Sequence, residues 1–145
     1  MAAVHCELSK IMIAETSDYH VIWLREKTGA GRDFPILIGL FEAVAIDRKI
    51  REVETPRPLT HDLLANAISS LSGTLEKVIV TDLRNNTFYA TLVIRQNGNV
   101  VEVDSRPSDA IALAVRLDTP IYVEESVIDQ VTCWQEGQDE GSDYA

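Results

Sequence analysis

The segment from Ser105 to Leu117 reads Ser-Arg-Pro-Ser-Asp-Ala-Ile-Ala-Leu-Ala-Val-Arg-Leu. It joins a polar turn to a run that is apolar on nearly every side of a helix, so we predict a helix over residues 106–117. A helix of this kind must be buried or lie at an interface. The flanking segments are therefore interpreted as the surroundings of this helix.

Three runs upstream of this helix are rich in valine, isoleucine, threonine and aromatic residues. They cover residues 75–83, 87–95 and 100–104. Asn85-Asn86 separates the first two runs, and Asn97-Gly98-Asn99 separates the second from the third. Asparagine and glycine favour tight hairpin turns, so these runs predict a three-stranded meander.

Downstream of the helix, Asp118-Thr119-Pro120 ends the helical pattern. A short strand is expected over residues 121–123, and a short helical turn over residues 126–130.

The N-terminal half alternates strand and helix patterns in blocks. Strands are expected over residues 4–14, 19–24 and 34–38, with a bulge near Ser9 and Lys10 in the first, and helices over 40–51 and 60–71, the second with Thr60 as its N-cap. This arrangement favours an α+β fold over a doubly wound parallel sheet. We predict a mixed, mainly antiparallel sheet of about six or seven strands with three helices.

The net charge of −10 over 145 residues is unevenly spread. Seven of the 23 acidic residues, and none of the 13 basic ones, follow Val123. We therefore expect one domain over residues 1–130 and an acidic, flexible tail over 131–145. Binding of nucleic acid is possible but not supported by charge, because no basic stripe is visible.

The chain carries no apolar run long enough for a membrane span and no export signal pattern, so no membrane contact is expected. The two cysteines, Cys6 and Cys133, lack a CxxC pairing and fit a reducing compartment. We therefore expect a cytoplasmic protein.

Polar residues gather at the predicted helix starts, where free N–H groups and the helix dipole favour anions. If these starts converge, Glu42, Asp62 and Asp109 could hold Mg²⁺ or Mn²⁺, and His61 could act as base or acid. No organic cofactor is indicated, since no phosphate-binding or dinucleotide-binding glycine motif is present. With Arg57 and Arg106 to bind phosphate, the set would suit metal-assisted phosphodiester hydrolysis: Glu42, His61, Asp62 and Asp109 as catalytic residues, and Arg57, Arg106 and Ser108 as substrate-binding residues.

Structural roles compete with these functional ones. Ser105 or Ser108, with Asp109, provides what a helix cap requires, and Arg106 could pair internally with Glu42 or Asp109. His61 could be a solvated surface residue. The strand aromatics Trp23, Phe88 and Tyr89 are expected to pack in the core rather than stack on bases, since no lysine or arginine is interleaved with them.

Four segments together carry a family resemblance: residues 34–43, which include Phe34-Pro35-Ile36-Leu37-Ile38-Gly39 and Glu42-Ala43, then Arg57 to Leu63, Thr87 to Ala90, and Ser105 to Ala114. In order and spacing, residues 4–129 resemble the bifunctional nuclease domain family of bacteria and plants. The resemblance implies a compact α+β domain that self-associates as a homodimer or higher homo-oligomer, with DNase and RNase activity in some members. It also implies shared polar positions at Glu42, Arg57, His61, Asp62, Arg106, Ser108 and Asp109.

Two functions are therefore open. The first is a nuclease that hydrolyses phosphodiester bonds in DNA and RNA with the help of a divalent metal. The alternative is a non-catalytic oligomeric interaction or ligand-binding module whose polar cluster is structural.

Overall fold

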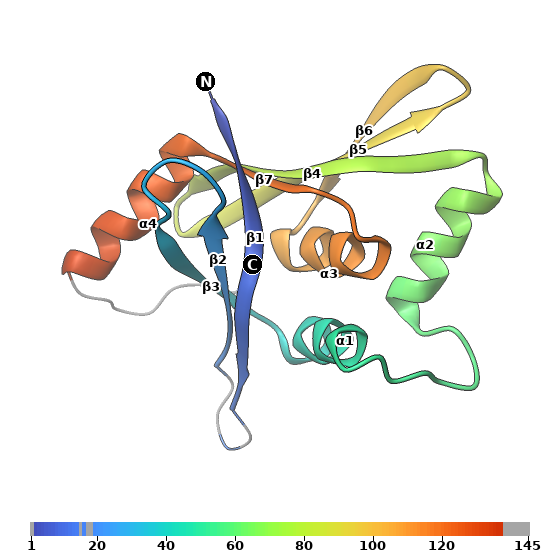
Figure 1. Ribbon diagram of the computed structural model, residues 1–145, viewed down its shortest axis with the longest axis horizontal. Coiled ribbons are helices and arrows are strands. Elements are labelled where there is room, and N and C mark those ends of the chain that lie inside the picture. Colours follow the sequence, from blue (N-terminus) through green and yellow to red (C-terminus); the bar gives the residue numbers. More distant parts are fainter. Residues whose placement is uncertain (1, 15, 17–18, 138–145) are drawn as a thin grey trace.

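The computed structural model describes residues 2–14, 16 and 19–137. Within these residues the chain forms one seven-stranded sheet and four helices (Figure 1). The strands are β1 (Ala3–Ile13), β2 (His20–Glu26), β3 (Asp33–Ile38), β4 (Gly73–Arg84), β5 (Thr87–Gln96), β6 (Asn99–Ser105) and β7 (Ile121–Glu124). The helices are α1 (Leu40–Ile50), α2 (Thr60–Ser70), α3 (Pro107–Leu117) and α4 (Glu125–Gly137).

The sheet has the strand order β3-β2-β1-β7-β4-β5-β6. Every neighbouring pair is antiparallel except β4 and β7, which run parallel because α3 carries the chain back between β6 and β7. The predicted α+β fold with a mixed, mainly antiparallel sheet is confirmed. The predicted bulge is also confirmed, by a shift in the β1–β2 register between Leu8 and Lys10.

The predicted meander is formed by β4, β5 and β6. Asn85 and Asn86 adopt φ values of 51° and 63°, and Asn97 and Gly98 adopt 51° and 84°. Two consecutive positive φ angles are what a tight hairpin turn requires, and asparagine and glycine reach them at low cost. The residue types at these turns therefore fix the register of the three strands.

The prediction of three helices is wrong, because the described residues include a fourth. Only a short turn over residues 126–130 was expected where α4 runs from Glu125 to Gly137. Val127, Ile128 and Val131 lie on one face of this helix and are buried, but acidic and polar residues between them obscure the apolar pattern. The expected boundary at residue 130 falls inside α4, and residues 138–145 of the expected tail lie outside the described residues. None of the helices in the described ranges has the length and apolar character needed to span a bilayer.

Helix α3 lies at the centre of the fold, as its apolar sequence predicts. It packs against α1, α2, β4 and β5, and Ala110, Ile111 and Leu113 have no exposed surface. Figure 1 shows α1 and α3 beneath β4, with α2 beside them and the β5–β6 hairpin extending past the helices. The N-termini of the three helices are thereby brought to one side of the sheet.

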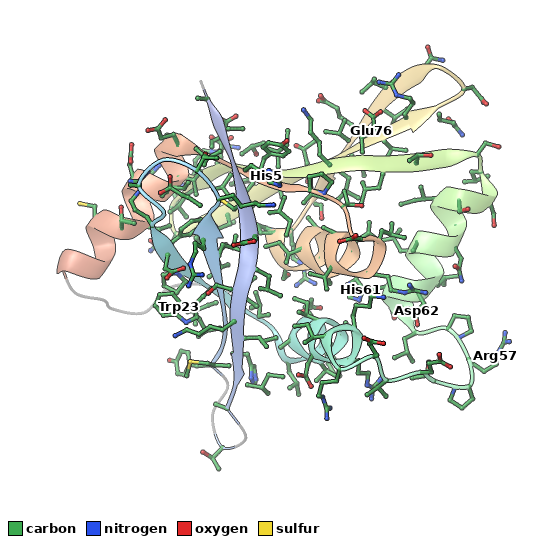
Figure 2. The ribbon with its side chains drawn as sticks, in the orientation of Figure 1. His5, Trp23, Arg57, His61, Asp62 and Glu76 are labelled. Carbon is green, nitrogen blue, oxygen red and sulfur yellow. The ribbon has the colours of Figure 1, made fainter. Side chains whose placement is uncertain are left out.

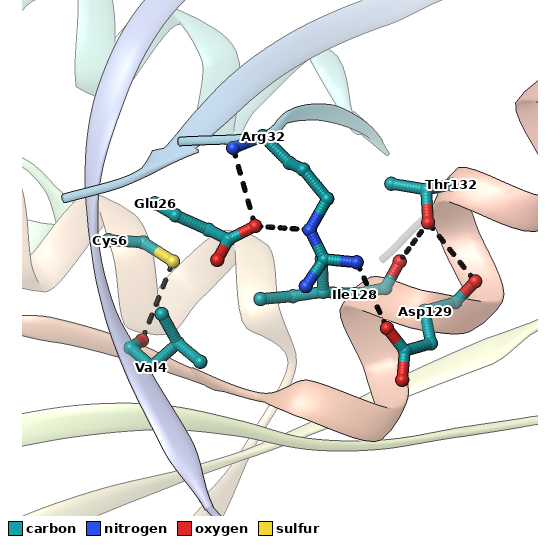
Figure 3. Close-up of polar contacts among 7 residues, drawn as sticks. All are labelled: Val4, Cys6, Glu26, Arg32, Ile128, Asp129 and Thr132. Atoms are coloured by element: carbon teal, nitrogen blue, oxygen red, sulfur yellow. Dashed lines mark hydrogen bonds and ion pairs between the residues drawn. The ribbon is translucent and has the colours of Figure 1, made fainter. Parts of the chain in front are cut away.

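A second polar cluster joins the β2–β3 loop to α4 (Figure 3). The Arg32 guanidinium bonds the carboxylate of Glu26, which is 5% exposed, and its Nη1 donates to Asp129 Oδ1 at 3.0 Å. Both bonds raise the pKa of Arg32, and the bond to Glu26 has the larger effect. The cluster closes the loop onto the sheet and fixes α4 against it.

Candidate functional site

The starts of α2 and α3 meet through one side-chain contact. His61 Nε2 lies 3.0 Å from Asp109 Oδ1, although 48 residues separate them in sequence. His61 occupies the first turn of α2, and its side chain is 14% exposed (Figure 2). Because an ionised carboxylate can only accept, His61 donates to it from Nε2, and the form of the imidazole with its one proton on Nε2 keeps a lone pair on Nδ1.

Arg106 connects this pair to the start of α1. Its Nε donates to Asp109 Oδ2 at 2.9 Å, and its Nη2 lies 2.8 Å from the same oxygen and 3.0 Å from Glu42 Oε2. Glu42 is in the first turn of α1, where the helix dipole favours its charge. The Glu42-Arg106-Asp109-His61 network therefore joins the N-termini of α1, α2 and α3, which is the convergence that a shared site needs.

The network sets the charge of its members. The hydrogen bond from His61 holds the pKa of Asp109 below its usual value. Burial of Asp109 opposes this effect, and the hydrogen bond and charge of Arg106 add to it. Partial burial of Arg106 lowers its pKa, but the ion pairs with Asp109 and Glu42 outweigh burial and raise it. A carboxylate that stays charged beside a guanidinium is suited to orient an imidazole.

Asp62 lies beside this network but bonds different partners. Its Oδ2 accepts from the backbone N–H of Leu59 at 3.0 Å, and its Oδ1 accepts from Arg116 Nε at 2.7 Å. These two bonds, that of Leu59 first, lower the pKa of Asp62. Leu59 is thus the N-cap of α2 in place of the expected Thr60, and its free N–H is satisfied by Asp62 three residues later.

Arg116 was missed by the sequence analysis. The available signal was its position as a lone charged residue after Asp109 in the apolar helix α3. A cation placed there needs an acidic partner, but the pattern does not say which acid supplies it.

The remaining two predicted substrate-binding residues lie in different environments. Arg57 is exposed on the loop between α1 and α2, and Figure 2 shows it at the outer edge of the molecule. Ser108 is fully buried in the first turn of α3. Arg106 is the N-cap of α3 and makes no side-chain capping bond, while Ser105 Oγ donates to the Arg106 carbonyl at 2.9 Å.

The three acids predicted to bind a metal are divided between two arginines. Glu42 and Asp109 bond Arg106, whereas Asp62 bonds Arg116. In the part of the chain that the structure describes, no group of three or more His, Cys, Asp or Glu side chains is placed to hold a metal ion. This side-chain arrangement does not fit a shared divalent ion, and use of Mg²⁺ or Mn²⁺ remains a prediction.

His61 lines a cavity of about 640 Å³ on one side of the network. Arg106 and Asp109 line the same cavity, together with apolar residues of α2, β5 and β6. His61 also lines a cavity of about 560 Å³ between α1, the α1–α2 loop and α3. The second cavity contains Arg48, Lys49, Arg57 and Arg116 against three acids, so its lining is not acidic although the chain is.

Known proteins share this sequence over most of its length. A family profile described as the bifunctional nuclease domain matches residues 22–136. An uncharacterised protein of Mycobacterium tuberculosis is 44% identical over 120 residues, which cover 83% of this chain and 71% of that protein.

Plant proteins named as nucleases are more distant relatives. Bifunctional nuclease 1 of Oryza sativa subsp. indica is 22% identical over 120 residues, which cover 81% of this chain and 36% of the rice protein. Bifunctional nuclease 1 of Arabidopsis thaliana is 27% identical over 114 residues, which cover 77% of this chain and 35% of that protein. The match thus spans about a third of each plant protein. The resemblance drawn from the four sequence segments is confirmed, and the chain belongs to the bifunctional nuclease domain family.

Proposed function

We propose that this chain is a nuclease that hydrolyses phosphodiester bonds in DNA and RNA. The observation that carries the proposal is the contact between His61 and Asp109, at 3.0 Å, on the wall of a cavity that Arg106 also lines. A carboxylate-oriented imidazole beside a guanidinium is a suitable set for phosphoryl chemistry. Membership of the family supports the same reaction class.

The proposed roles follow from the contacts. His61 takes a proton from a water molecule through Nδ1, and the water oxygen bonds to phosphorus as the bond from phosphorus to the ester oxygen breaks. The ester oxygen takes a proton from solvent water, and the His61 imidazolium returns its proton to solvent. Asp109 holds the imidazole in orientation through Nε2. Arg106, whose side chain is 55% exposed, presents charge to the phosphate, and Glu42 fixes its direction.

The cavity of about 560 Å³, whose lining is not acidic, offers a place for the phosphates on either side of the one that reacts. Arg57 lines it and is exposed, so the predicted role of Arg57 in substrate binding is retained in the proposal. This local arrangement partly offsets the repulsion that a chain of net charge −10 exerts on nucleic acid.

Divalent metal dependence is proposed as a separate property. Glu42, Asp62 and Asp109 remain the candidate ligands, and their binding of Mg²⁺ or Mn²⁺ would require the arginine contacts to change. Addition of EDTA should then stop cleavage, and Mg²⁺ or Mn²⁺ should restore it. Cleavage that persists after exhaustive chelation would exclude metal dependence.

The decisive experiment is cleavage of labelled DNA and RNA oligonucleotides by the purified protein and its His61→Gln variant. Loss of the general base should lower kcat by about 10²–10⁴-fold. His5→Gln is the matched control, because His5 stacks on Tyr122 with ring centres 5.0 Å apart and lies outside the site. Equal cleavage by His61→Gln and the parent protein would assign the activity to a contaminant or to another site.

A second candidate function is a non-catalytic oligomeric module with a structural polar cluster. The observation that favours it is the pairing of Arg106 with a carboxylate on each side, which leaves its charge internally balanced. Under this function the parent protein cleaves nothing, and Arg106→Ala lowers the melting temperature and changes the mass found by light scattering. An Arg106→Ala variant with the melting temperature and the mass of the parent protein would argue against it.

A further inference from the structure

The cavity of about 640 Å³ is lined by apolar side chains as well as by the polar network. We propose that it binds the base of a nucleotide whose phosphate contacts Arg106 and His61. The proposal rests on the proposed function and adds to it a recognition subsite for the nucleoside next to the reacting phosphate.

The apolar part of the cavity comes from three elements. Phe88 and Leu92 lie on the same face of β5 and are 7% and 5% exposed. Val103 pairs with Leu92 from the adjacent strand β6, and Leu64 faces the cavity from α2. Val103 is 40% exposed and Leu64 37% exposed, so the cavity presents apolar surface that a ligand can cover.

The polar part lies at the helix starts. Arg106 and Asp109 of α3 and His61 of α2 line the cavity, and they are held together by bonds of 2.8–3.0 Å. A ligand that fills the cavity must therefore be apolar at one end and anionic at the other. A nucleoside phosphate has this form, whereas inorganic phosphate or a sugar phosphate leaves the apolar part uncovered.

The size of the cavity agrees with this ligand. Cavities that hold small molecules and cofactors are typically about 300–1,000 Å³, mostly apolar, with a few polar groups that orient the ligand. Asp104 and Ser105 also line the cavity and supply hydrogen-bonding groups for the base edge or the sugar. Apolar contact tolerates all four bases, so weak base preference is expected.

The test compares three ligands by isothermal titration calorimetry on the intact chain: adenosine 5′-monophosphate, ribose 5-phosphate and inorganic phosphate. Adenosine 5′-monophosphate should bind about tenfold or more tightly than ribose 5-phosphate, because only it covers the apolar surface. Leu64→Ser should weaken the nucleotide about tenfold and leave ribose 5-phosphate unchanged.

The matched control is the neighbouring leucine on the same helix. Leu63 is 61% exposed and does not line the cavity, so Leu63→Ser should bind all three ligands as the parent does. Melting curves of both variants check that each is folded. With a dinucleotide substrate, Leu64→Ser should raise KM, as expected if the cavity also binds a nucleotide that is part of a strand.

Equal affinity for adenosine 5′-monophosphate and ribose 5-phosphate would overturn the inference even if the protein cleaves nucleic acid. Nucleotide binding with the expected Leu64 dependence, but without any cleavage, would support the subsite and reject the nuclease proposal. If Leu64→Ser instead lowers the mass in solution and no nucleotide binds, the cavity is covered by a second copy of the chain and the inference is wrong.

Discussion

Arg116 Nε lies 2.7 Å from Asp62 Oδ1, although 54 residues of sequence separate these two side chains. The pair joins the last turn of α3 to the first turn of α2. Because His61 precedes Asp62 directly, the same contact fixes the position of the imidazole relative to Asp109. The candidate site thus lies next to a second ion pair, Asp62–Arg116, which shares no side chain with the His61–Asp109 contact.

Replacement of Asp62 by asparagine should change the dependence of stability on acid. Its folded pKa is lower than the unfolded value, so its contribution is fully present above about pH 4 and is lost as pH falls through the folded pKa. Chemical denaturation at a series of pH values should show Asp62→Asn less stable than the parent at pH 7, with the difference shrinking below pH 4.

Arg116→Gln is the companion variant for this measurement. It removes the hydrogen bond and the charge of Arg116 and leaves the hydrogen bond from the Leu59 N–H, which is the first cause of the lowered pKa of Asp62. Arg116→Gln should therefore remove only part of the pH dependence of stability that Asp62→Asn removes. A pH profile for Asp62→Asn that parallels the parent down to pH 2 would contradict the role given to this carboxylate.

The Glu26–Arg32 pair should contribute more to stability than the nearby Arg25–Asp33 pair. Arg32→Ala removes the guanidinium from the Glu26 carboxylate, which is 5% exposed, leaves the hydrogen bond from the backbone N–H of residue 32, and should cost about 3 kcal/mol. In Arg25–Asp33 the side chains are 48% and 41% exposed, so Arg25→Ala should cost about 0.5 kcal/mol. Urea denaturation of both variants measures the difference, and equal losses would refute this ranking.

The two cysteines should differ sharply in reactivity. Burial raises the pKa of Cys6 to about 12; the Glu26 charge also raises this pKa, and the Arg32 charge lowers it. Cys133, in contrast, is exposed. Because the thiolate is the reactive form, a thiol reagent at pH 8 should modify one cysteine per native chain and two after denaturation. Cys133→Ser should then show no rapid reaction, and rapid modification of that variant would place Cys6 in a different environment.

Local patterns were sufficient to predict most of the fold. The β4–β6 meander follows from two turns built of asparagine and glycine, and the burial of α3 follows from its apolar sequence. The position of β7 between β1 and β4 could not be predicted, because a run of four residues does not indicate which distant strands it pairs with. The length of α4 was underestimated, as a short turn over residues 126–130, because charged and polar residues surround its narrow buried face.

The candidate site was predictable as a set of residues, and so was the pairing of Arg106 with Glu42 or Asp109, but the contacts between α2 and α3 were not. Helix starts attract acidic and polar residues for local reasons, so Glu42, His61 and Asp109 were identifiable from sequence alone. The partners of these residues depend on packing between helices. The Asp62–Arg116 pair shows the limit, since neither residue type nor spacing indicates a contact across 54 positions.

The most direct test of the proposed mechanism is a double-mutant cycle on His61 and Asp109. If Asp109 acts by holding the imidazole through the 3.0 Å contact, its role disappears once the imidazole is removed. His61→Gln and Asp109→Asn should each lower kcat, and the double variant should be about as active as His61→Gln alone. Multiplication of the two losses would mean that the residues act independently, with Asp109 serving mainly to position Arg106 through the 2.9 Å bond. Because both variants keep similar side-chain volume, melting curves can separate this loss of kcat from a loss of folded protein.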